Sequence, residues 1–171
     1  MPPPLNAAAA LGISYREASE SDSLFLAVVY ASTREEELAQ TGWPDETKQQ
    51  FLAHQFNAQN LDYKRNFPHA ERLVIERDGE GVGRLYIVDL DDHILLIDLA
   101  ILPDFRNLGI GGAIFADVMA QASAAAKPVR IHVEKNNPAR RLYDRLGFTF
   151  YRDDGVYDLL EWRPEGMPDP D

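Results

Sequence analysis

The sequence predicts a mixed α/β domain in which one mixed β-sheet carries helices on both faces. Three observations support this. Short aliphatic, strand-like segments recur along the chain, Asp-Gly turns separate two pairs of them at residues 78–81 and 153–155, and longer helical stretches lie between the groups. The resulting order is strand, two helices, three strands, helix, strand, helix, two strands, which gives seven strands in all. A length of 171 residues, of which 45% are hydrophobic, fits one domain spanning residues 1–171.

The first third of the chain predicts one strand followed by two helices. Residues 13–18 have strand character, and Ser21 or Asp22 is placed to cap the helix that follows to about residue 39. The run at residues 41–44 contains Gly and Pro and breaks that helix. Asp45 is then expected to cap a second helix, whose apolar stripe is irregular.

The middle of the chain predicts three consecutive strands. Residues 73–76 and 82–90 flank the Asp-Gly turn and form a hairpin. Residues 93–102 form the most apolar strand in the chain, so we expect it at the centre of the sheet.

The last third predicts two helices and three strands. An alanine-rich helix runs over residues 109–126, and a strand follows at residues 129–133. A second helix begins near Pro138 and ends at Gly147, because proline suits the first turn and glycine the end of a helix. A closing hairpin pairs two strands, at residues 148–152 and 156–162.

Composition and charge exclude several functions. A formal net charge of −11 argues against general nucleic-acid binding, which needs Lys and Arg at phosphates. The absence of cysteine excludes disulfides and thiolate chemistry, and the four histidines include no HxxxH pair, so no metal site is expected. No apolar stretch approaches the roughly 20 residues that span a bilayer. We therefore expect a cytoplasmic protein without membrane contact, with flexible ends at about residues 1–11 and 164–171.

The segment over residues 99–112 predicts a phosphate-binding loop. A buried strand runs into a loop, and the loop runs into a helix whose start contains Gly109, Gly111 and Gly112. The first turn of a helix carries free N–H groups and a positive dipole end, so it binds anions. Glycine lets the anion approach the backbone closely, and Arg106 can add charge or brace the loop.

Three phosphate-binding patterns compete for this segment. A dinucleotide fingerprint requires glycine where Ile114 stands, and a Walker loop requires Lys and Ser or Thr where Ala113 and Ile114 stand. The third pattern, Arg/Gln-x-x-Gly-x-Gly/Ala, is met fully by Arg106, Gly109 and Gly111. It is the signature of the GNAT acetyltransferase superfamily, which this chain resembles.

A second segment strengthens the resemblance. Residues 133–148 resemble the family's other cofactor segment: a strand end, an Asn, a helix containing Leu142-Tyr143, then Gly147-Phe148. The likeness covers about residues 73–162. It implies a mostly antiparallel seven-stranded sheet that splays between the strands at residues 93–102 and 129–133, with the pantetheine arm of the acyl donor in the gap.

The resemblance also implies the residues that bind acetyl-coenzyme A, which serves as the acyl donor. The motif asparagine is Asn136 by its spacing to Tyr143 and Asn137 by its spacing to Val133, and we favour Asn137. An N-cap role is the alternative for either. The expected contacts are Leu99, Ala100, Ile101, Arg106, Asn107, Leu108, Gly109, Ile110, Gly111, Gly112, Asn136, Asn137, Arg140 and Tyr143.

Three residues are candidates for catalysis. Tyr143 matches the family's tyrosine near the thiol and can protonate the departing thiolate. A base must deprotonate the acceptor amine, and the family does not fix its position. His132 has a suitable ordinary pKa, whereas burial can raise the pKa of Asp98; Glu134 shares a face with His132. A buried acid paired with an arginine is the structural alternative for Asp98.

The expected function is therefore direct transfer of an acetyl group to a primary amine in a ternary complex. The acceptor is a small molecule, a peptide or a protein, and a homodimer is compatible with the family. The alternative is a non-catalytic acyl-coenzyme A-binding sensor or structural module with the same fold. Acidic and aromatic side chains are expected to face the acceptor: Glu35, Glu36, Glu37, Trp43, Tyr63, Tyr151 and Tyr157.

Overall fold

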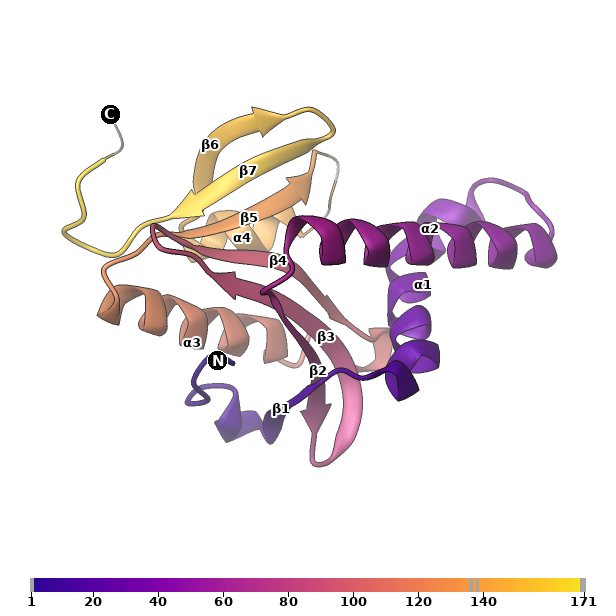
Figure 1. The fold of residues 1–171 in the computed structure, drawn as a ribbon, viewed down its shortest axis with the longest axis horizontal. Coiled ribbons are helices and arrows are strands. Elements are labelled where there is room, and N and C mark those ends of the chain that lie inside the picture. Colours follow the sequence, from indigo (N-terminus) through magenta and orange to yellow (C-terminus); the bar gives the residue numbers. More distant parts are fainter. Residues whose placement is uncertain (1, 136, 138, 170–171) are drawn as a thin grey trace.

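A seven-stranded sheet in the order β1-β2-β3-β4-β5-β7-β6 forms the centre of the molecule (Figure 1). The structure is a computed structural model that describes residues 2–135, 137 and 139–169. Neighbouring strands pair antiparallel, except that β4 and β5 are parallel. The strands are β1 (Ile13–Glu17), β2 (Glu71–Arg77), β3 (Glu80–Asp89), β4 (Ile94–Ile101), β5 (Val129–Glu134), β6 (Thr149–Asp154) and β7 (Tyr157–Trp162).

Helices cover both faces of this sheet, which confirms the predicted fold class. The long helix α2 runs beyond the sheet beside α1, while α3 lies along the sheet (Figure 1). Asp45 is the first helical residue of α2 and Pro44 its N-cap, so Asp45 does not cap the helix as expected. The helices are α1 (Ser23–Ala39), α2 (Asp45–Asn66), α3 (Ile110–Ala124) and α4 (Arg140–Leu146), with short 3₁₀ turns η1 (Ala9–Leu11), η2 (Glu20–Asp22) and η3 (Pro103–Phe105).

Strand alternation divides the core between the two faces. On one face, Ile114 and Phe115 of α3 pack with inward residues of the central strands, including Leu85, Leu96 and Ile131. A smaller cluster on the other face joins α1 and α2 to β2, made by Leu26, Tyr30, Phe56 and Val74. Arg84 of β3 lies opposite Val74 and so shares this second face, and Asp98 of β4 lies opposite Tyr86, two residues further along β3.

A buried carboxylate attaches the start of the chain to α3. Asp117 is 2% exposed, and its carboxylate accepts the backbone N–H groups of Asn6, Ala7 and Ala8 at 2.8 to 3.1 Å. Ala8 is fully buried in the larger core. We expected residues 1–11 to be a flexible end, and an alanine run carries no sequence signal for such an attachment. Within the described part of the chain, no helix is both long and apolar enough to cross a membrane.

Candidate active site

The central strands β4 and β5 separate halfway along their length. Their parallel pairing covers only three residue pairs and ends at Leu96 and Ile131. Beyond that point, β4 continues to Ile101 and β5 to Glu134. Ile97 is an extra residue in β4, because Tyr86 of β3 pairs with Asp98 and the next residue of β3 pairs with Leu96. Such a bulge bends and twists a strand, which accounts for the divergence.

The divergence leaves one backbone edge of β4 without a neighbouring strand. Leu99, Ala100 and Ile101 pair with β3 on their other side. Their second edge faces the gap. The carbonyl of Ile101 already accepts a hydrogen bond from Arg106 there, and the other peptide groups on this edge are available to a ligand that runs alongside the strand. These are the residues for which the sequence predicted contacts to the pantetheine arm.

The loop after β4 leads into the glycine-rich start of α3. Gly109 is the N-cap with φ 83°, and Asn107 has φ 61°, a left-handed conformation that Asn tolerates better than most residues. No side chain caps this helix end. A Cβ atom built on Gly111 or Gly112 would meet no atom within 4 Å. Because no side chain caps them, the first-turn N–H groups remain available to an anion, and the two glycines leave room for it to approach.

Arg106 braces this loop. Its Nε donates to the carbonyl of Ile101 at 2.8 Å, and its Nη2 lies 3.4 Å from the hydroxyl of Ser32 on α1. The side chain stays exposed, so its positive charge remains near the helix start. Both functions that the sequence suggested for Arg106, bracing and charge, are compatible with this position.

Two residues expected near the cofactor already have partners within the chain. The Oδ1 atom of Asn137 accepts the N–H of Ala139 at 2.9 Å, which shapes the entrance to α4. Arg140 donates to Asp158 of β7 at 2.6 Å, which fixes α4 to the sheet. Asn136 lies outside the described residues, so the choice between the two asparagines remains a prediction.

Tyr143 of α4 lies between the core and the gap. Its ring makes edge contacts with Phe115 and Phe148, at centroid distances of 5.6 and 6.1 Å. Burial, and then the negative charge of Asp98, raise the pKa of Tyr143 to about 12. The phenol therefore keeps its proton at neutral pH and is available as a donor.

Asp98 pairs with a buried arginine that sequence reasoning did not identify. The Nη2 atom of Arg84 on β3 contacts the Asp98 carboxylate. Burial raises the pKa of Asp98, and the charge of Arg84 opposes that rise. The available signal was an arginine within an apolar strand beside a strand that carries a lone aspartate. The predicted alternative of a buried acid paired with an arginine agrees with this contact.

Four tyrosines from four elements are close enough to Asp98 for its charge to raise their pKa. They are Tyr63 of α2, Tyr86 of β3, Tyr143 of α4 and Tyr157 of β7. In each case burial is the larger cause. Asp98 thus lies where the helices of both faces and the second half of the sheet converge.

His132 and Glu134 of β5 point to the face of α1 and α2. His132 Nε2 lies 3.0 Å from Asp154 of β6, and its ring contacts Tyr157 at a centroid distance of 6.3 Å. Glu134 forms an ion pair with Arg34 of α1 at 3.6 Å. Both side chains lie beyond the point where β4 and β5 separate.

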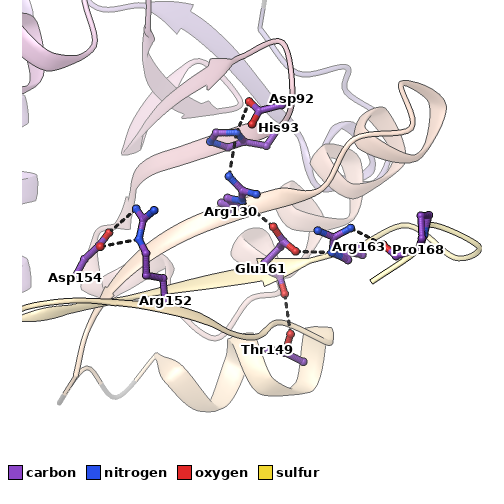
Figure 2. A network of polar contacts seen from close by, with 9 residues as sticks. All are labelled: Asp92, His93, Arg130, Thr149, Arg152, Asp154, Glu161, Arg163 and Pro168. Atoms are coloured by element: carbon purple, nitrogen blue, oxygen red, sulfur yellow. Dashed lines mark hydrogen bonds and ion pairs between the residues drawn. The ribbon is translucent and has the colours of Figure 1, made fainter. Parts of the chain in front are cut away.

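A separate polar network occupies the closed end of the sheet, where β4 and β5 are still paired (Figure 2). The Glu161 carboxylate is 4% exposed and bridges Arg130 at 2.7 Å and Arg163 at 2.5 Å. Arg163 in turn donates to the carbonyl of Pro168 at 2.7 Å. Tyr151 stacks on Arg130 at 4.3 Å and belongs to this network, so it does not line the gap as expected.

No group of three potential metal ligands is found among the described residues.

A comparison with known protein families identifies the family of this chain. The model of the acetyltransferase (GNAT) family matches residues 31–148, more than half of the chain. The chain belongs to the GNAT acetyltransferase family. It is accordingly an acyltransferase, as the two motifs predicted.

Two curated relatives are named for different acetyltransferase activities. A Bacillus subtilis protein provisionally named a ribosomal protein bS18-alanine N-acetyltransferase is 29% identical over 105 residues, 56% of this chain and 69% of that protein. The mycothiol acetyltransferase of Actinosynnema mirum is 32% identical over 96 residues, 53% of this chain but only 29% of that protein.

Solved structures confirm the fold. The PaiA N-acetyltransferase of Thermoplasma acidophilum, in complex with coenzyme A, has a TM-score of 0.66 at 16% identity, covering 88% of this chain and 98% of its own. An acetyltransferase of Thermus thermophilus has a TM-score of 0.64 at 18% identity, covering 90% and 97%. At these identities the likeness shows the fold alone.

Proposed function

We propose that this acyltransferase uses acetyl-coenzyme A and moves the acetyl group directly to a primary amine in a ternary complex. The observation that carries the proposal is the gap between β4 and β5. The uncapped, glycine-rich start of α3 lies at one side of the gap, and Tyr143 and Asp98 lie at the other. The helix start suits the pyrophosphate of the cofactor, and the gap suits its extended arm.

The glycine-rich start of α3, from Gly109 to Gly112 (the cradle), is proposed to hold the diphosphate by its backbone N–H groups. Leu99, Ala100 and Ile101 are proposed to pair with the amides of the pantetheine arm. Arg106 adds positive charge without having to move, because its bond to Ile101 already fixes it beside the loop. Arg140 is proposed to act indirectly, by holding α4 in place through Asp158.

The chemistry requires a neutral amine and a protonated leaving group. The amine nitrogen attacks the thioester carbon, a C–N bond forms, and the C–S bond breaks. Tyr143 is proposed to protonate the departing thiolate, because its raised pKa keeps the phenol protonated. The proton lost by the amine is proposed to pass to Asp98, whose charge acts on the Tyr143 phenol. His132 of β5 is the alternative base, and its ring is held by Asp154 of β6.

The acceptor is proposed to be cationic before it loses its proton. The open part of the gap carries Asp98 and Glu134. Burial raises the pKa of Tyr157, and the charges of Glu134 and Asp98 raise it further, so this phenol lies near both. Acidic and aromatic side chains together favour an ammonium group. A small polyamine, an amino sugar and a peptide N-terminus share this chemistry.

Calorimetric titration with acetyl-coenzyme A tests the binding half of the proposal. We expect micromolar affinity for the native chain and none for Gly111→Trp, since that residue has open space that an indole would fill. Ala120→Trp is the matched control, because Ala120 is exposed on the same helix more than two turns further along. No binding by the native chain would refute the cofactor assignment.

A panel of amines, scored by thiol release and by mass spectrometry of the acceptor, tests the transfer half. Acetylation of at least one cationic amine is expected. Binding of acetyl-coenzyme A without transfer to any amine or peptide of the panel would favour the sensor or structural module instead.

A further inference from the structure

Arg84 is a buried arginine in the middle of a strand. Arg84 is only 1% exposed, and a buried charge is unfavourable unless other groups compensate it. Nη2 contacts the Asp98 carboxylate and donates to Gln59 of α2 at 2.9 Å. The guanidinium lies over the rings of Tyr30 and Tyr86, at 5.7 and 5.2 Å. Nη2 is therefore held toward Asp98, whereas Nε and Nη1 are buried without a hydrogen-bond partner among the described residues.

The other groups around Asp98 are neutral or more distant. Its charge raises the pKa of Tyr86 of β3, Tyr63 of α2, Tyr143 of α4 and Tyr157 of β7, after the larger effect of burial, and its own strand contributes the N–H of Leu99. Further out, Arg34 of α1 is paired with Glu134 of β5, and His132 of β5 with Asp154 of β6. Within the described chain, Arg84 is thus the cation in direct contact with Asp98.

We propose that Arg84 is a positioning residue that keeps Asp98 ionised and directed into the gap, without itself touching either substrate. The inference rests on the proposed function, in which Asp98 accepts the proton of the acceptor amine. A buried carboxylate without a cation takes up a proton, and a protonated Asp98 cannot accept another. Arg84 therefore decides the pH below which the reaction stops.

The competing explanation is purely structural. Through Gln59, Arg84 also links β3 to α2, so its loss can loosen the helix that covers this face. A structural defect lowers activity by a similar factor at every pH. A change in the ionisation of Asp98 instead shifts the pH profile, so the profile distinguishes the two.

The first experiment compares Arg84→Met with Arg84→Lys. For the native chain, kcat/KM falls on the acid side as Asp98 becomes protonated. This fall is the acid limb of the pH profile. In Arg84→Met the acid limb moves to higher pH by about 1–3 units, which is the usual effect of losing one close opposite charge, and activity is recovered at alkaline pH. Arg84→Lys keeps the charge and leaves the limb near its native position. An acid limb that stays in place in Arg84→Met, while activity falls evenly, overturns the proposal.

The second experiment reads Asp98 directly and does not require turnover. The ¹³C carboxyl shift of Asp98, assigned with Asp98→Asn, is titrated in the native chain and both variants, and its midpoint must rise in Arg84→Met alone. An unmoved midpoint refutes the role of Arg84. If no amine is acetylated, the proposed function fails, and this titration still decides whether Arg84 sets the ionisation of Asp98.

The double variant Arg84→Met with Asp98→Asn guards against a folding defect. Replacing both members of a buried pair is far milder than removing one, so this variant should fold and bind acetyl-coenzyme A like the native chain. Its activity should equal that of Asp98→Asn alone, because Arg84 acts only through Asp98. A further loss in the double variant would mean that Arg84 acts by another route.

Discussion

Arg34 of α1 and Glu134 at the end of β5 approach each other to 3.6 Å across the open side of the gap. The contact joins a helix from the first half of the chain to the part of β5 that no longer pairs with β4. The Tyr157 phenol lies nearby, since its pKa responds to both charges, after the larger effect of burial. An incoming ammonium would meet Glu134 here and compete with Arg34 for it.

Glu134→Gln should weaken the binding of cationic acceptors. Both side chains are partly exposed, at 21% for Arg34 and 53% for Glu134, so the interaction is worth at most about 1 kcal/mol. We expect KM for a cationic amine to rise about two- to fivefold at low salt, and less at high salt. Arg34→Gln should lower that KM, because Glu134 is then unpaired.

Glu165→Gln is the control for this pair, because it removes the same charge from an exposed position after β7. Steady-state kinetics at two salt concentrations provide the measurement. Equal effects of Glu165→Gln and Glu134→Gln would mean that overall charge, rather than a contact with the acceptor, sets KM.

Tyr143→Phe should separate catalysis from binding. The ring contacts with Phe115 and Phe148 survive the change, so stability and acetyl-coenzyme A affinity should stay near native values. Loss of a general acid typically costs about 10²- to 10⁴-fold in kcat. Because the pKa of Tyr143 is raised to about 12, titration of this phenol should not reduce the native rate anywhere between neutral pH and pH 10.

Single-turnover transfer and calorimetry measure the two effects, with Tyr151→Phe as the control because that tyrosine lies on Arg130 away from the gap. An unchanged kcat in Tyr143→Phe would remove the general-acid assignment. It would leave water as the proton source for the thiolate.

Much of the fold could be predicted because its signals are local. The Asp78-Gly79 turn marks a hairpin, and Gly147 with φ 93° ends α4 as expected. Strand order is a different matter. Alternation of residues tells which side chains face the core, whereas it does not tell that β7 rather than β6 pairs with β5.

The site divides in the same way. The proposed cradle is continuous in sequence, so the spacing of Arg106, Gly109 and Gly111 was enough to predict an uncapped, glycine-rich helix start after β4. The acceptor side combines Arg34, Arg84 and Glu134, which are far apart along the chain and become neighbours only through packing. Sequence reasoning therefore found the carboxylates and missed both arginines that pair with them.

Gly83→Ala should destabilise the junction of β3 and β4. A Cβ atom at this position would lie 2.2 Å from the carbonyl oxygen of Ala100, so the two strand backbones would have to separate. We expect a loss of about 1–3 kcal/mol in the free energy of unfolding, measured with urea. Gly112→Ala is the matched control: its Cβ meets open space in a helix, so stability should hold or rise slightly. Equal stability of the two variants would contradict the close approach at Gly83.

Asp117→Ala should release the start of the chain from α3. Three backbone N–H groups lose their acceptor, and each of Asn6, Ala7 and Ala8 then has to find water or move. Because the carboxylate is buried, we expect a loss of about 2–3 kcal/mol in the free energy of unfolding.

Hydrogen exchange locates that effect. The amides of residues 6–8 should exchange far faster in Asp117→Ala than in the native chain, while those of β4 stay protected. Asp144→Ala, at an exposed position on α4, provides the control. Acetyl-coenzyme A should still bind, because the cradle N–H groups belong to α3 itself. Near the cradle, the start of the chain contributes Leu11, whose Cδ1 would lie 4.0 Å from a Cβ atom on Gly109. Fast exchange of residues 6–8 already in the native chain would show that Asp117 does not hold the segment in solution, and the expected flexible end would then stand.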